Sequence, residues 1–338
     1  MYKTATKVAF LELAICKKNY IQHFFTFLFL CIITEKKIYF KEKVMNPLQT
    51  NLPYILAGIS TGGQYALIAI GYTMVYGILR LINFAHGDVF MAAGLIMISA
   101  YSFMPLWVSI PFTIILTVLL GFAVERVAYK PLRTAPRMSI MISAIGMSYL
   151  LQNLALYFTG GLLKKYPTIP WISDSITIAG AITKRVTVIT PFLTILLVVA
   201  LVLLINHTKI GMAMRAVSKD FETAQLMGIK IDSVISTTFI IGSFLAAVGS
   251  ILFFSNYPGV TPTVGGMPGL KAFVAAVFGG IGSIPGAVIG AFLIGICENI
   301  IKGVGLTTFS DAFTFVLLIC VLMFMPTGIF GEKVTDKV

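Results

Sequence analysis

Charged residues are scarce in this sequence of 338 residues. Asp, Glu, Lys and Arg make up only 11% of it, against about a quarter of a typical soluble domain. Hydrophobic residues make up 58%, and the mean hydropathy is +0.94. This excludes a soluble globular protein. The apolar runs are long enough for membrane-spanning helices of about 20 residues and lack the alternation of a barrel strand. We therefore predict an all-α, polytopic integral membrane protein.

The sequence also lacks the marks of a nucleotide-binding or metal-binding enzyme. It has no GxxxxGK[ST] loop, no polar stretch long enough for a soluble nucleotide-binding domain, and no set of residues for hydrolytic catalysis. Its four cysteines are scattered without ligand spacing: Cys16, Cys31, Cys297 and Cys320. We predict a chain that is not an enzyme and binds no cofactor or metal. The net charge of +12 is typical of basic cytoplasmic loops, not of nucleic-acid binding.

The first 44 residues differ from the rest. They hold no glycine or proline, although the chain has 30 Gly and 14 Pro, and their apolar core at 24–34 is short for a span. Met45, Asn46 and Pro47 then open a segment typical of a natural start. We predict that residues 1–44 are an extension from a misassigned start codon, with a genuine anchor or signal segment as alternatives. Residues 45–331 form the main domain and residues 332–338 a tail.

Uncharged runs predict about eight spans. Their expected bounds are Pro53–Tyr76, Val89–Phe103, Leu106–Val124, Met138–Phe158, Val186–Asn206, Val234–Phe254, Leu270–Ile300 and Ala312–Met325. The seventh run is interrupted by glycines at 279, 280 and 282 and by Pro285. We expect a discontinuous or re-entrant segment near 272–295, because such backbone survives at membrane depth only when it is buried or lines a cavity. Gly286 and Gly290 then have the spacing that lets a neighbouring helix approach closely.

A polar insert at 209–232 separates two runs without charge. Its charged side chains place it in water, between two spans. Five small or apolar residues recur at spacings of three and four, which predicts one face of a helix with Gly228 as its stop: Met214, Val217, Phe221, Ala224 and Gly228. This face either packs on the protein's own bundle or the lipid headgroups, or docks on a soluble partner.

Basic loops predict the orientation. The loop after the third span, at 125–137, and the polar insert both carry a basic excess and fall on one side, which we expect to be cytoplasmic. The loop at 159–185 then faces outward, and the side of the N-terminus stays ambiguous. If the seventh run re-enters without crossing, the C-terminus returns to the cytoplasm.

The segment Arg80–Asp88 brings polar residues between the first two spans. Asn83, His86 and Asp88 either form a turn that caps the second span or line the translocation path or its gate. The interrupted run adds Gly282, Pro285 and Gly286 to the candidate path or gate.

Four blocks together resemble permease subunits of branched-chain amino-acid ABC importers, the LivH type. They are GGQYALIAIGYTMVYGILRLINFAHGD at 62–88, ERVAYKPLR at 125–133, the insert at 211–230, and AFVAAVFGGIGSIPGAVIGAFLIG at 272–295, followed by MPTGIFG at 325–331. The resemblance covers about residues 45–331. It implies a multi-pass protein of a bacterial or archaeal cytoplasmic membrane.

The insert is similar to the coupling loop of importer permeases, where Glu-Ala-Ala precedes a glycine after three further residues. Here Glu222 and Ala224 flank a threonine and Gly228 follows. The resemblance implies that Glu222, Ala224 and Gly228, with Arg215, Val217 and Phe221, couple the chain to a cytoplasmic ATPase.

The implied partners are a second homologous permease, two ATP-binding subunits that hydrolyse ATP, and an extracytoplasmic binding protein. The implied mechanism is alternating access for leucine, isoleucine or valine. Urea, short amides or other amino acids are alternative substrates of the same architecture. An ATP-independent secondary transporter and a membrane scaffold without transport are alternatives of other classes.

Overall fold

The computed structural model describes residues 47–133, 135–178, 181–325 and 327–330. The predictions for residues 1–44 and 332–338 therefore lie outside the described residues. The chain divides into two compact units, Met1–Thr50 and Asn51–Val338, and the second holds all the elements discussed below apart from the first residues of α2.

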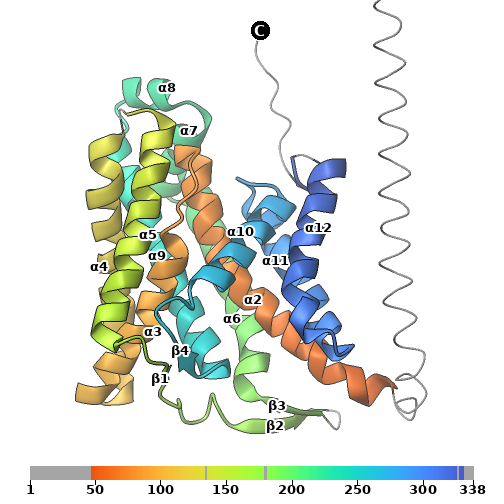
Figure 1. The fold of residues 1–338 in the computed structure, drawn as a ribbon. Helices are drawn as coiled ribbons and strands as arrows, with labels where there is room; N and C mark the ends of the chain where they lie inside the picture. Colours follow the sequence, from red (N-terminus) through yellow and green to blue (C-terminus); the bar gives the residue numbers. More distant parts are fainter. Residues whose placement is uncertain (1–46, 134, 179–180, 326, 331–338) are drawn as a thin grey trace, which may run out of the picture. The chain divides into compact units, whose positions relative to one another are not determined.

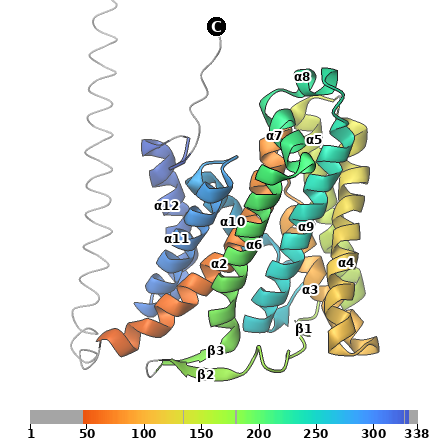
Figure 2. The same ribbon diagram turned by 180° about the vertical axis from the view of Figure 1, so that it is seen from behind.

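Helices make up nearly all of the second unit (Figures 1 and 2). Their bounds are α2 (Pro47–Leu79), α3 (His86–Phe103), α4 (Leu106–Val124), α5 (Arg137–Thr159), α6 (Arg185–His207), α7 (Lys209–Lys219), α8 (Phe221–Leu226), α9 (Ile231–Asn256), α10 (Gly266–Gly279), α11 (Ile284–Gly303) and α12 (Ser310–Phe324). Short helical turns are η1 (Glu125–Tyr129), η2 (Lys130–Leu132) and η3 (Thr307–Phe309). Strand β1 (Lys164–Lys165) pairs with β4 (Gly259–Val260), and β2 (Ser175–Ile178) pairs with β3 (Ala181–Lys184), both antiparallel.

The predicted all-α membrane architecture is confirmed. Within the described residues, seven helical segments are long and apolar enough to cross a membrane: Asn51–Leu79, Leu106–Leu132, Arg137–Thr159, Arg185–His207, Ile231–Asn256, Ile284–Gly303 and Thr307–Phe324. The predicted run Val89–Phe103 corresponds to α3, which has 18 residues and begins with polar side chains. The predicted run Leu270–Ile300 is divided between α10 and α11, and α10 has only 14 residues.

Two helices form the centre of the bundle. The most apolar window of α2 is 72% buried and that of α9 is 61% buried, whereas the values for α6 and α12 are 17% and 11%. In Figure 1, α2 runs diagonally through the unit, and α4, α5 and α12 lie at its periphery. The outward faces of the peripheral helices carry large apolar side chains, as expected of surfaces that contact lipid or another membrane subunit.

The loops gather at two opposite ends, as predicted for the two sides of a membrane. Helices α7 and α8 lie at one end with the turns that follow α4, and the β2–β3 hairpin lies at the other (Figure 1). Arg133, from the basic loop, forms ion pairs with Glu125 and with Asp232 at the start of α9. The loop at 125–137 and the polar insert therefore share one end, and the loop at 159–185 belongs to the other.

Helices α3 and α10 both begin inside the bundle. The first residues of α3, His86 to Asp88, are buried, and the His86 ring lies against the backbone of Gly71, two turns before the end of α2. A Cβ atom added to Gly265 would lie 2.2 Å from the carbonyl oxygen of Gly87, and one added to Gly269 would lie 2.9 Å from the Gly87 Cα atom. The two helix N-termini thus meet with their backbones in contact.

The predicted interruption of the seventh run is confirmed, and it reverses the chain direction. Gly280 and Gly282 have φ angles of +106° and +101°, which favour glycine, and they end α10. The Ser283 hydroxyl then accepts a 3.3 Å hydrogen bond from the Gly286 N–H at the start of α11. Helices α10 and α11 form an antiparallel pair, and a Cβ atom on Gly279 would lie 2.0 Å from the Gly286 carbonyl oxygen.

Glycines also bring α11 against α2. A Cβ atom on Gly295 would lie 2.3 Å from the backbone nitrogen of Gly62 and 2.7 Å from the carbonyl oxygen of Gly58.

We predict that Gly295→Ala lowers the free energy of unfolding by about 1–3 kcal/mol, because α2 and α11 must separate to admit the added Cβ atom. Gly146→Ala is the matched control: a Cβ atom there meets nothing within 4 Å. Thermal unfolding in detergent should show a lower midpoint for Gly295→Ala alone, and equal midpoints would contradict this packing.

Candidate functional site: the α7–α8 insert

The polar insert folds into two helices, so the predicted single helix is wrong. Helix α7 ends at Lys219, and Asp220 then adopts an extended conformation, with φ −151° and ψ 115°. The Asp220 carboxylate accepts hydrogen bonds from the N–H groups of Glu222 and Thr223, at 3.0 and 3.2 Å. The cause is local: aspartate stabilises a helix N-terminus better than a helix interior, so it ends one helix and caps the next.

Gly228 ends the second helix, as predicted. Its φ angle is +82°, and its N–H donates to the Gln225 carbonyl oxygen at 3.0 Å. The next N–H, that of Ile229, donates to the Ala224 carbonyl oxygen at 3.1 Å. These two bonds form the Schellman motif, in which a left-handed residue satisfies the last helix carbonyls.

The insert is fixed to the bundle on one side. Met214, Val217 and Ala224 are buried in the chain's own hydrophobic cluster, which includes α9, so for them the first alternative, packing on the bundle, holds. Val217 and Ala224, predicted for coupling, therefore support the insert from beneath. Arg80, just after α2, donates from its guanidinium to the Ser218 carbonyl oxygen at 3.3 Å. Arg215, predicted for coupling, donates to the Asn206 carbonyl oxygen at 3.3 Å and so joins α7 to the end of α6.

The other side of the insert presents large apolar side chains to solvent. Leu226 is 87% exposed and Phe221 is 41% exposed, so Phe221 does not pack on the bundle with the rest of the predicted face. The change of direction at 220 turns the Phe221 side chain out of the face that Met214 and Val217 share. Exposed apolar groups on a segment too charged for hydrocarbon are typical of an interaction site. The exposed apolar residues of the insert are Ile210, Met212, Phe221, Leu226 and Met227.

A groove of about 480 Å³ lies between α7 and α8. Its floor is apolar and small, with Ala213, Ala216 and Ala224, and two lysines stand at its rim, Lys209 and Lys219. The remaining lining residues are Met212, Asp220, Thr223, Met227 and Ile229. Glu222 is exposed and next to this groove in sequence.

The predicted path or gate residues near α3 are buried, and two of them form hydrogen bonds to neighbouring elements. Asn83 accepts a 2.8 Å hydrogen bond from the Tyr129 hydroxyl, which joins the loop before α3 to η1. Asp88 accepts hydrogen bonds from Ser148 and, at 3.0 Å, from Gln152, both on α5. His86 packs edge-on against the Tyr72 ring, with centroids 5.0 Å apart. These contacts place Asn83, His86 and Asp88 together where α3 begins, and a role in the path stays a prediction.

The other candidates lie apart from that group. Gly282 and Pro285 are exposed at the turn between α10 and α11, and Gly286 is buried where the two helices touch. Their geometry supports the turn, and a role in a path or gate stays a prediction for them as well.

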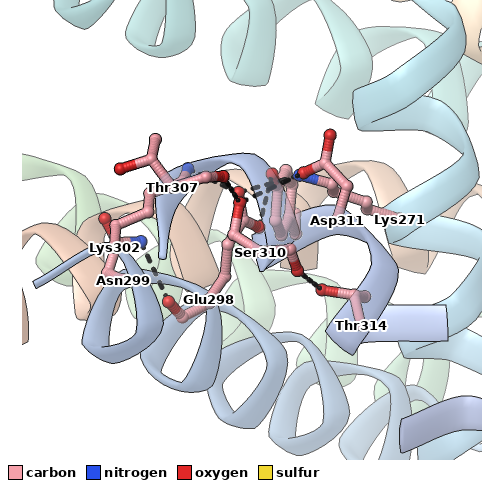
Figure 3. Close-up of polar contacts among 10 residues, drawn as sticks. Lys271, Glu298, Asn299, Lys302, Thr307, Ser310, Asp311 and Thr314 are labelled. Carbon is pink, nitrogen blue, oxygen red and sulfur yellow. Dashed lines mark hydrogen bonds and ion pairs between the residues drawn. The ribbon is translucent and has the colours of Figure 1, made fainter. Parts of the chain in front are cut away.

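Two charged clusters were missed by the sequence reasoning. Arg133 lies between Glu125 and Asp232 at the end of the bundle that carries the insert, and Ser236 donates to Glu125 at 2.9 Å. A second cluster, around the fully buried Glu298, lies between α2, α10, α11 and α12 (Figure 3). Two partners of Glu298, Tyr65 on α2 and Lys271 on α10, come from other elements and share no local pattern with it. The third, Lys302, lies four residues away on α11.

Together, the buried bundle and the exposed insert define a multi-pass membrane protein with a polar insert at one end. The sequence profile of the family described as "Branched-chain amino acid transport system / permease component" matches residues 54–322. The chain belongs to this family, and it is a multi-pass protein of the cytoplasmic membrane.

Individual relatives agree with the family assignment. The chain is 40% identical over 320 residues to the high-affinity branched-chain amino acid transport system permease protein LivH of Salmonella typhimurium, covering 90% of this chain and 100% of that protein. LivH of Escherichia coli K12 is 39% identical over 320 residues, with the same coverage of this chain and of that protein. The permease protein BraD of Pseudomonas aeruginosa is 40% identical over 300 residues, 85% of this chain and 98% of its own length.

The Schellman motif gives a direct test of the insert's geometry. We predict that Gly228→Ala costs about 1–2 kcal/mol locally, because a Cβ atom is strained at this φ although the space around it is open. The amides of Gly228 and Ile229 should then exchange hydrogen faster in the intact protein. Gly77→Ala, with open space and an ordinary helical backbone, should leave these amides unchanged. Equal protection in both variants would refute the capping role.

Proposed function

We propose that this chain is the membrane permease of an ATP-driven importer of branched-chain amino acids, and that the α7–α8 insert docks on the ATPase. The observation that carries the docking proposal is the exposed apolar surface of the insert, above all Leu226 and Met227, which are 87% and 79% exposed. A partner that covers these side chains removes their apolar surface from water, which favours association.

The chemistry of the insert favours a soluble protein partner over lipid. Lys209, Lys219 and Lys230 accompany the carboxylates of Asp220 and Glu222 within the same segment. Such a mixture of charges around an apolar centre is the usual composition of a protein interface. The groove between α7 and α8 would accept an apolar side chain of the partner.

The insert also has the rigidity that force transmission needs. Its buried residues Met214, Val217 and Ala224 pack in the cluster that contains the first turns of α9, and α7 contacts both α6 and α9. Helix α9 continues through the centre of the bundle as far as Asn256. A displacement of α8 by an ATPase would therefore reach the central helix through packed side chains.

The substrate proposal rests on the relatives. Their names assign them to high-affinity transport of branched-chain amino acids, and the match to one of them covers 90% of this chain and all of that protein. By this analogy the chain moves leucine, isoleucine or valine by alternating access. The remaining subunits would be a second, homologous permease, two ATP-binding subunits that carry out hydrolysis, and an extracytoplasmic binding protein.

Docking is tested by one surface substitution. Leu226→Lys should weaken co-purification of the ATP-binding subunits and lower their affinity about tenfold or more, because an exposed apolar contact at the centre of the interface is lost. ATP-dependent leucine uptake should fall in parallel. Binding would be measured in detergent with purified subunits.

Ile182→Lys is the matched control for this test. Ile182 is 74% exposed but lies in the β2–β3 hairpin at the opposite end of the bundle. Its replacement should leave ATPase binding unchanged. Undiminished binding by Leu226→Lys would remove α8 from the interface, and equal losses in both variants would show a general effect of added charge.

A further inference from the structure

A cluster of charged residues lies buried between helices at a distance in sequence from the insert. It consists of Tyr65 on α2, Lys271 on α10, Glu298 and Lys302 on α11, and Asp311 on α12 (Figure 3). We call it the Glu298 cluster. Charged groups at membrane depth are costly unless paired, and they are commonly functional.

Glu298 is the centre of the cluster. One carboxylate oxygen accepts hydrogen bonds from Lys271 Nζ at 2.8 Å and from Lys302 Nζ at 2.6 Å. The other accepts from the Tyr65 hydroxyl at 3.0 Å. Lys271 also pairs with Asp311, at 2.6 Å. Two lysines and two carboxylates thus balance in charge.

Burial is unequal within the cluster. The side chains of Glu298 and Lys271 are only 1% and 7% exposed, whereas those of Lys302 and Asp311 are 30% and 47% exposed. The Lys271–Glu298 pair therefore carries most of the desolvation cost. A buried pair is often no more stabilising than apolar residues of similar volume, so stability alone is a weak explanation for it.

The two lysines differ in what they join. Lys302 lies four residues from Glu298 on the same helix, so its ion pair connects no separate elements. Lys271 reaches Glu298 from α10, a helix of 14 residues that begins inside the bundle. When either lysine is replaced, Glu298 keeps the other ammonium group and the Tyr65 hydroxyl as partners. Neither substitution therefore leaves the buried carboxylate of Glu298 unpaired.

The first turn of α10 packs closely on neighbouring helices. Gly269 lies two residues before Lys271, and a Cβ atom there would lie 2.9 Å from Gly87 Cα and 3.2 Å from the Tyr72 hydroxyl. Tyr72 in turn packs on His86 and on Phe273, with ring centroids 5.0 and 6.0 Å apart. The Lys271–Glu298 pair thus joins α10 to α11, two residues away from the contact that Gly269 makes with α3.

We infer that Lys271 and Glu298 are positioning residues for transport: their ion pair holds the start of α10 against the start of α3. This inference rests on the proposed transport function. Loss of the pair lets the first turn of α10 shift, so the two helix N-termini no longer move together when the bundle reorients. ATP hydrolysis then proceeds with less amino acid transported.

The matched test compares Lys271→Met with Lys302→Met in the full importer, reconstituted in liposomes. The readouts are leucine uptake and ATP hydrolysis, both per inserted permease. Lys271→Met should lower the maximal uptake rate about tenfold and raise the ATP hydrolysed per leucine, whereas Lys302→Met should change both less than about twofold. Lys271→Arg, which keeps the charge and reaches the same carboxylate, should restore most of the uptake.

Each outcome decides between positioning and simple charge balance. Equal losses in the two lysine variants would overturn the inference, as would a fall in uptake with an unchanged ratio of ATP to leucine. Should Lys271→Met not reach the membrane, Lys271→Gln replaces it with the same criteria. The proposed function fails separately, if the unaltered importer takes up leucine without any need for ATP.

Discussion

The structure depends on close contact between helix backbones in a medium that offers them no water. Backbone N–H and C=O groups in a hydrocarbon core must form their hydrogen bonds within the protein, yet the N-termini of α3 and α10 lie inside the bundle. Gly87, Gly265 and Gly269 make this feasible, because the absence of side chains lets the two ends bury each other. Gly295 allows the same close backbone contact between α11 and α2. Any added Cβ atom at these positions would push elements apart.

This contact is one of those that join two groups of helices. In one group, the α7–α8 insert packs on α9 through Met214, Val217 and Ala224. In the other, the Glu298 cluster joins α2, α10, α11 and α12. The junction of α3 and α10 connects the two groups, and α2 also packs directly on α9. Asn83 and Asp88 anchor the α3 side of the junction to Tyr129 and to α5.

Much of this organisation could be predicted from the sequence, because hydrophobic runs and charged inserts report directly on the membrane. The spans, the break after Gly279 and the helix stop at Gly228 are local properties, set by apolar length and by glycine conformation. The bend at Asp220 was missed, since the apolar periodicity continues across it while the carboxylate caps a new helix. Tyr65 and Lys271, the partners of Glu298 on other helices, were beyond sequence reasoning, because they lie 233 and 27 residues from it in the sequence.

In the mechanism proposed above, an external ATPase drives this permease through the α7–α8 insert. The most direct measurement is uptake of labelled leucine by liposomes that contain the complete importer and its binding protein, with ATP supplied on the side of the α7–α8 insert. We expect accumulation of leucine above the external concentration only with hydrolysable ATP on that side. Equilibration at the same rate with and without ATP would contradict it.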